Sequence, residues 1–150
     1  MLNFTAEQIV FQEVPDEVSL AFTISGCLLG CKGCHSSESW SANSGLVLSQ
    51  DYLWQRLQTY QGLISCVLFL GGEWQLSRLL PLLQMARNRQ LHTCLYTGLD
   101  DISASLKSQL TFLKTGRWIA ELGGLDSPIT NQRFIDLRTG ECLNHRFNRK

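Results

Sequence analysis

The stretch Ser65–Glu73, SCVLFLGGE, indicates the fold. From Cys66 to Leu70 it is a continuous apolar run, of the kind that lies buried on both faces of a parallel sheet. The strand is expected to end at Gly71, where two glycines and an acid follow. Since ligands gather at the carboxyl ends of the strands in such folds, this turn is also a candidate binding element.

Strands and helices are expected to alternate on both sides of this run. Further strands are expected at residues 18–25, 92–98, 111–116 and 133–137, with a possible hairpin return through residues 138–141. Helices are expected at residues 49–62, from about Pro81 to residue 90, and at residues 100–110. Ser49 is the expected N-cap of the first helix, and Gly62 is expected to end it. The third helix is expected to be capped by an acidic residue. This alternation indicates parallel βα units.

The bulk properties indicate a globular protein of one domain. The chain has 150 residues, 44% of them hydrophobic, with 13 basic and 13 acidic side chains. A balanced charge argues against a broad nucleic-acid surface. We see neither a signal peptide nor an apolar run long enough to cross a bilayer, so we expect no membrane partner and a cytoplasmic location. Clustered cysteines there bind metal more often than they pair.

Three of the six cysteines lie in one glycine-rich loop, SGCLLGCKGCHSSESW, at residues 25–40. Cys27, Cys31 and Cys34 have the spacing C-x-x-x-C-x-x-C. Thiolates suit zinc and iron–sulfur clusters, but a closed zinc site needs four ligands. A four-iron cluster held by three cysteines leaves one iron free to bind a small molecule, as a catalytic site requires.

This cysteine spacing after the first strand, with Gly-Gly-Glu after the second, resembles the radical S-adenosylmethionine superfamily. The short chain and the stretches FLGGEW, LYTG and SPITNQRFIDL are similar to the activating proteins of anaerobic ribonucleoside-triphosphate reductase. The resemblance implies an α/β fold, an incomplete parallel (β/α) barrel of about five strands. It implies a single compact radical SAM domain over residues 1–150, with a cluster loop at 26–40 and a C-terminal strand and tail at 133–150.

The resemblance also implies an activity. Cys27, Cys31 and Cys34 would ligate a [4Fe–4S] cluster whose free iron chelates S-adenosylmethionine, and Gly71, Gly72 and Glu73 would line the methionine moiety. Reductive cleavage of this cofactor would produce a radical that takes a hydrogen atom from a glycine of the reductase large subunit. The electron would come from a reducing donor such as flavodoxin.

The resemblance says less about five other positions. Asn131 and Gln132 lie in a loop that is either an ordinary surface loop or a cofactor or partner element. Trp118 is the first candidate for contact with the partner. Trp74 stands where the superfamily commonly has proline, and Gly33 stands where many members place an aromatic residue near the adenine.

Simpler interpretations stay open beside these. The triplet with His35 is a possible structural zinc site, which would make the chain a non-catalytic zinc-binding module. The protein is alternatively an activase of another glycyl-radical enzyme, of the pyruvate formate-lyase type. Cys66 and Cys94 are expected to be buried thiols, and Cys142 is given no role.

Overall fold

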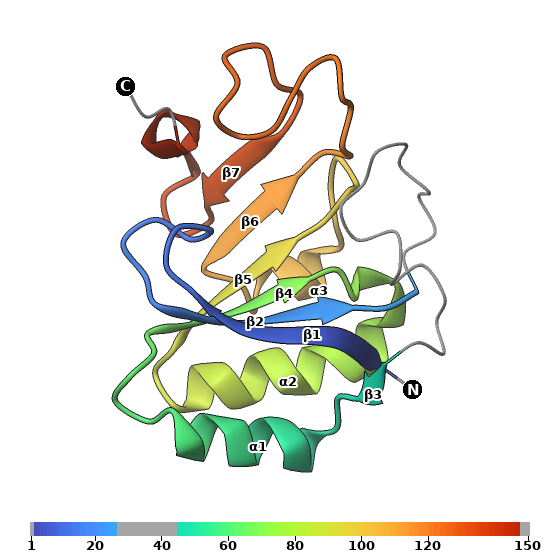
Figure 1. Cartoon of the computed structure of the whole chain (residues 1–150), viewed down its shortest axis with the longest axis vertical. Helices are drawn as coiled ribbons and strands as arrows, with labels where there is room; N and C mark the ends of the chain where they lie inside the picture. The colour runs from blue at the N-terminus through green and yellow to red at the C-terminus, as the bar shows by residue number, and fades with distance from the viewer. Residues whose placement is uncertain (1, 27–44, 148–150) are drawn as a thin grey trace.

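The computed structural model describes residues 2–26 and 45–147, and eight strands of this part of the chain form one mixed sheet (Figure 1). Its order is β3-β1-β2-β4-β5-β6-β7-β8. The strands are β1 (Asn3–Val10), β2 (Ser19–Ile24), β3 (Leu46–Val47), β4 (Cys66–Leu70), β5 (His92–Tyr96), β6 (Phe112–Thr115), β7 (Arg133–Asp136) and β8 (Glu141–Cys142). The helices are α1 (Gln50–Thr59), α2 (Leu76–Asn88) and α3 (Ala104–Lys107), with the 3-10 helices η2 (Glu73–Gln75) and η3 (Asn144–Phe147).

The predicted incomplete parallel (β/α) barrel of about five strands is wrong. Across the described residues, β2, β4, β5 and β6 pair in parallel, whereas the other four of the seven pairings are antiparallel. A parallel return usually needs a crossover helix. No helix lies between β6 and β7, and β7 runs back antiparallel beside β6. The sheet is therefore mixed, with β3 and β8 at its edges.

The antiparallel strand β1 was not expected from the sequence. It pairs with β2 along most of its length, with a register shift between Phe4 and Ala6. Phe4 is buried on the side of the helices, where it lies 5.3 Å from the ring of Phe22. The rest of the strand is mostly half-buried and partly polar, so its sequence lacks the strong apolar signal of β4.

The helix α1 follows its predicted start. The Ser49 side chain accepts a hydrogen bond from the main-chain N–H of Tyr52 at 3.0 Å, which satisfies one free donor of the first turn. Leu53 and Leu57 are buried, as their spacing on one helix face predicts. The helix ends at Thr59 instead of Gly62, which lies in the following turn.

The two later helices begin elsewhere than predicted. The helix α2 starts at Leu76, not near Pro81, because the 3-10 turn η2 runs directly into it. Pro81 removes one helical N–H, but the carbonyl that loses its donor belongs to Ser77, an exposed residue. The helix α3 is only four residues long, and its cap is Ser103 instead of an acid.

Apolar side chains pack on both faces of the sheet. The helices α1 and α2 cover one face of the sheet (Figure 1). On one face Phe22 and Phe69 stack, with ring centroids 6.0 Å apart. The second cluster includes Cys66, Cys94 and Phe134. Both cysteines are fully buried, which confirms their predicted place. Burial raises the pKa of the Cys66 thiol to about 12 and that of Cys94 well above its ordinary value.

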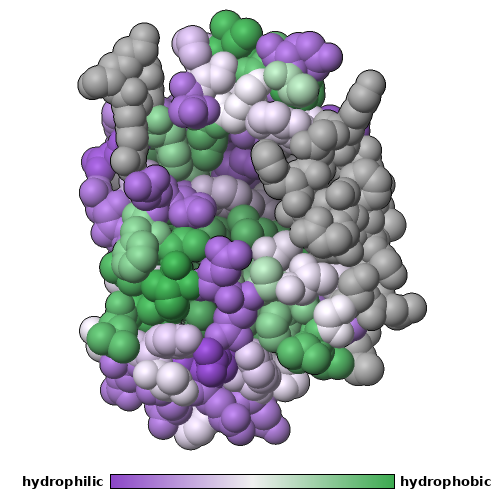
Figure 2. Space-filling model, viewed as in Figure 1, coloured by the Kyte–Doolittle hydropathy of each residue, from purple (hydrophilic) through white to green (hydrophobic). Residues whose placement is uncertain are grey.

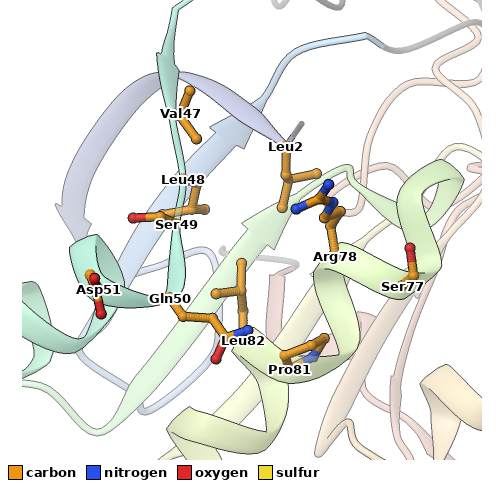
Figure 3. Close-up of a pocket in the computed structure, with 10 residues that line it drawn as sticks. All are labelled: Leu2, Val47, Leu48, Ser49, Gln50, Asp51, Ser77, Arg78, Pro81 and Leu82. Carbon is orange, nitrogen blue, oxygen red and sulfur yellow. The ribbon is translucent and has the colours of Figure 1, made fainter.

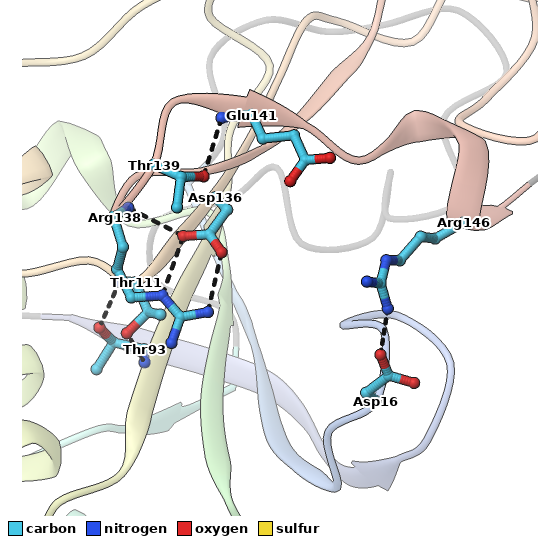
Figure 4. A network of polar contacts seen from close by, with 8 residues as sticks. All are labelled: Asp16, Thr93, Thr111, Asp136, Arg138, Thr139, Glu141 and Arg146. Carbon is cyan, nitrogen blue, oxygen red and sulfur yellow. Dashed lines mark hydrogen bonds and ion pairs between the residues drawn. The ribbon is translucent and has the colours of Figure 1, made fainter.

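The C-terminal hairpin is as predicted, and an ion pair stabilises it (Figure 4). The Arg138 guanidinium donates to both carboxylate oxygens of Asp136, at 3.0 and 2.9 Å. These bonds lower the pKa of Asp136. In the turn, Gly140 donates its main-chain N–H to the carbonyl of Asp136 at 2.7 Å.

None of the helices formed by the described residues is long and apolar enough to cross a membrane. The surface carries both hydrophobic and hydrophilic side chains (Figure 2). Hydrophobic patches lie between hydrophilic side chains on the face shown in Figure 2. Large exposed apolar side chains include Phe11, Trp54 and Leu63. Exposed apolar residues that are scattered singly are normal on protein surfaces.

Candidate cofactor site at the carboxyl edge

The parallel strands end together at one edge of the sheet, which we call the carboxyl edge. Thr23 of β2 pairs with Leu70 of β4. Leu70 in turn pairs with Tyr96 of β5, and Tyr96 pairs with Lys114 of β6. The structure therefore brings the turn at Gly71–Glu73 next to the residues that lead from β2 toward the cysteine loop. It also brings Thr97 and Gly98 to the same edge. This convergence is the one that the predicted strands implied.

Glycines make the tight turns at this edge. Gly26 after β2, Gly71 and Gly72 after β4, and Gly116 after β6 all have φ between 96° and 108°. Residues with a Cβ rarely adopt this conformation. At Gly71 a second constraint applies, because a Cβ there would lie 2.7 Å from Cη2 of Trp74. The Trp74 ring thus lies against Gly71, and the turn has room for it only because residue 71 lacks a side chain.

Glu73 carries a carboxylate oxygen that is buried and lacks a hydrogen-bond donor in the described residues. Its Oε1 atom is shielded from solvent and has no hydrogen-bond partner among residues 2–26 and 45–147. Burial raises the pKa of the Glu73 carboxyl, while hydrogen bonds from Thr97 and from the main-chain N–H groups of Glu73 and Trp74 act in the opposite direction. A buried acceptor without a donor costs about 1–3 kcal/mol. The site is therefore suited to a ligand that brings a hydrogen-bond donor, above all a cationic one.

The predicted cluster ligands lie outside the described residues. These are Cys27, Cys31 and Cys34, together with His35 and Gly33, so their roles stay predictions of the sequence. The described residues contain no group of three or more His, Cys, Asp or Glu side chains placed to hold a metal ion. Of the predicted cluster loop at 26–40, the structure describes only Gly26.

Asn131 and Gln132 hold the turn that follows β6. Gln132 is 4% exposed, and its Nε2 donates to the carbonyl of Gly116 at 3.3 Å. The Asn131 Nδ2 donates to the carbonyl of Arg117 at 3.1 Å, and its Oδ1 is buried without a partner in the described part of the chain. These bonds give both residues a structural role. Sequence reasoning missed it because the acceptors are main-chain atoms 14 and 16 residues away.

Trp118 and Cys142 are also placed by the structure. Trp118 is half-buried, and its Cζ3 would lie 3.6 Å from a Cβ built on Gly124. Its contact with a partner stays a prediction. Cys142 is exposed, and its Sγ lies 3.3 Å from the Asn144 Oδ1.

A separate cavity of about 810 Å³ lies where the first turns of α1 and α2 approach β3 (Figure 3). Leu2 and Leu82 contribute apolar walls, and Ser49, Ser77 and Arg78 contribute polar ones. None of the predicted site residues that the structure describes is among the residues that line it. It is thus distinct from the turns at the carboxyl edge.

The site's sequence also matches a known family. Residues 17–122 match the family model described as a 4Fe-4S single cluster domain. The match includes the cysteine triplet and the turn at Gly71–Glu73, and it ends before Asn131 and Gln132. A comparison with curated proteins found no match.

Proposed function

Because the chain belongs to the family of 4Fe-4S single cluster domains and is thus an iron–sulfur protein, we propose that it is a radical S-adenosylmethionine activase. Its target would be anaerobic ribonucleoside-triphosphate reductase, on which it would generate a glycyl radical. One observation carries the proposal. The strand that leads to the cysteine triplet and the strand that ends in Gly71-Gly72-Glu73 are neighbours in parallel, so both segments leave the sheet at one edge.

The residues at the carboxyl edge fit S-adenosylmethionine. Cys27, Cys31 and Cys34 would hold the cluster. The α-ammonium group of the cofactor is a cationic donor of the kind that the buried Oε1 of Glu73 lacks. The glycines at 71 and 72 carry no side chain, which lets the backbone approach the methionine moiety closely. In this way the chain's own residues would bind and orient the cofactor and keep water from it.

The chemistry supplied by the bound cluster would be the transfer of one electron, received from a reduced donor such as flavodoxin, to the sulfonium group. With the cofactor bound, this electron would allow cleavage of the C5′–S bond, so that methionine is released and a hydrogen atom of the target glycine ends in 5′-deoxyadenosine. Cys27, Cys31 and Cys34 would hold the cluster, and Gly71, Gly72 and Glu73 would orient the cofactor for this cleavage.

Electron paramagnetic resonance tests this proposal directly. The cluster-loaded protein is incubated anaerobically with S-adenosylmethionine, a reductant and the reductase large subunit. We expect a glycine-centred radical, and no such signal from a reductase whose target glycine is replaced by alanine. A parallel incubation uses pyruvate formate-lyase. A radical on that enzyme and none on the reductase would assign the chain to the rival class of activases.

A further inference from the structure

The strand β1 lies between the two strands that flank the cysteine triplet in the sequence. The triplet falls in the connection from β2 to β3, and the sheet order places β1 between these two strands. Both pairings with β1 are antiparallel. The two ends of this connection are therefore held by one strand, which precedes both β2 and β3 in the chain.

Asn3 is the residue at which the two ends come together. On one side its carbonyl accepts a hydrogen bond from the main-chain N–H of Ser25 at 2.9 Å. On the other side it pairs with Val47, and the next main-chain N–H, that of Leu48, donates to the carbonyl of Leu2 at 2.7 Å. Adjacent strands lie about 4.8 Å apart, which places Ser25 about 10 Å from Val47. The ends of a free chain of about 20 residues would lie about 25 Å apart.

Gly45 allows β3 to approach β1 where the connection re-enters the sheet. Its φ is 83°, and a Cβ built on it would overlap the main-chain carbonyl oxygen of Phe4. A main-chain oxygen inside a ladder cannot turn aside as the end of a flexible side chain can. The attachment of this end to β1 therefore requires a residue without a side chain at position 45.

We propose that the start of β1, residues 2–4, is a positioning element that anchors both ends of the connection and so gathers the cysteine triplet for the cluster. Fixing the two ends removes part of the chain entropy that cluster binding would otherwise have to overcome. For a loop of about 20 residues this factor is at most about a hundred-fold in affinity. The inference rests on the cluster of the proposed function, and not on the cleavage of S-adenosylmethionine.

Amide hydrogen exchange in the wild-type protein is the first test. Coupling between two sites is reciprocal, so a cluster that is favoured by the anchored ends must itself favour the anchored ends by the same factor. Loading with iron and sulfide should slow exchange at the Ser25 and Leu48 amides by about ten-fold or more.

The Leu143 amide is the matched control for this measurement. It donates to the carbonyl of Phe134, also at 2.7 Å, and follows β8 at the other edge of the sheet. Its exchange should slow much less than that of Leu48. Equal slowing at all three amides, or none at Ser25 and Leu48, would mean that β1 only stabilises the sheet, and would overturn the inference.

The second test compares two glycine variants of the cluster-loaded protein. Gly45→Ala and Gly62→Ala place alanine at nearly the same φ, 83° and 82°, but a Cβ at Gly62 has no atom within 4 Å. A chelator should remove iron from Gly45→Ala about ten-fold or more faster than from the wild type, with Gly62→Ala close to the wild type. Equal rates for the two variants would overturn the inference.

These outcomes separate the inference from the proposed function. If Gly45→Ala does not fold, the exchange measurement on the wild-type protein decides alone. A wild-type protein that takes up iron and passes both tests, but does not cleave S-adenosylmethionine, would contradict the proposed function and leave the anchoring role standing. A wild-type protein that takes up no iron would overturn both.

Discussion

Glu73 illustrates what a sequence shows about a single residue and what it leaves out. Its place after two glycines made it a candidate, but that place fits a helix-start acid equally well. The structure adds the shielded Oε1 without a partner in the described residues, and the burial that raises the pKa of this carboxyl. Neither follows from the sequence, because both depend on which strands become neighbours.

The raised pKa of Glu73 predicts how the protein's stability depends on pH. Between the ordinary value of 4.5 and the higher folded value, the folded protein holds a proton that the unfolded chain has released. Stability should therefore fall as pH rises through this window. Glu73→Gln should remove this part of the dependence. Chemical unfolding of both proteins from acidic to neutral pH measures it.

The exposed Glu121→Gln variant controls for the loss of one carboxylate. The free energy of unfolding of the wild-type protein, relative to Glu73→Gln, should decrease as pH rises. If the difference in free energy of unfolding between the wild type and Glu73→Gln stays constant or increases with pH, this would contradict the burial that raises the pKa of Glu73.

Among the elements, the turn after β4 depends most strictly on its residues. Gly71→Ala should destabilise the protein in two ways, because φ is positive and the new Cβ would meet Trp74. Gly62→Ala is the matched control, since Gly62 has φ of 82° and no atom within 4 Å of a Cβ built there. We expect Gly62→Ala to cost about 1–2 kcal/mol from backbone strain. Gly71→Ala should cost about 1–3 kcal/mol more from overpacking.

Urea unfolding of the two variants measures this difference. Equal losses would mean that the Trp74 ring moves away freely, and that the turn is held by its backbone alone. The expected larger loss at Gly71 would support a turn in which Trp74 is part of the structure.

Elements with strong local signals were predicted from the sequence, and those with weak ones were not. The apolar run of β4 and the cap at Ser49 are local signals, and both elements are present. The strand β1 is half-buried and partly polar, and it was missed. The start of α2 was placed at Pro81, because the sequence does not show that η2 leads the chain into the helix several residues earlier.

At the scale of the whole molecule, the number and direction of the strands were wrong in the prediction. Antiparallel strands flank the four parallel ones, because β1 pairs with β2 from the N-terminal side and no helix carries the chain from β6 to β7. The central strands β2 and β4 were nevertheless predicted with their shared edge. That edge, and not the predicted incomplete barrel, is what brings Gly71–Glu73 near the start of the cysteine loop.

The formation of 5′-deoxyadenosine is the most direct test of the central claim. Iron and sulfide are loaded anaerobically into the wild-type protein, Cys31→Ala and the control Cys142→Ala, which removes an exposed thiol outside the triplet. With reductant and S-adenosylmethionine, we predict about four irons per chain and 5′-deoxyadenosine from the wild type and Cys142→Ala, and neither from Cys31→Ala. Release of 5′-deoxyadenosine by Cys31→Ala, or none by a fully loaded wild-type protein, would contradict the account.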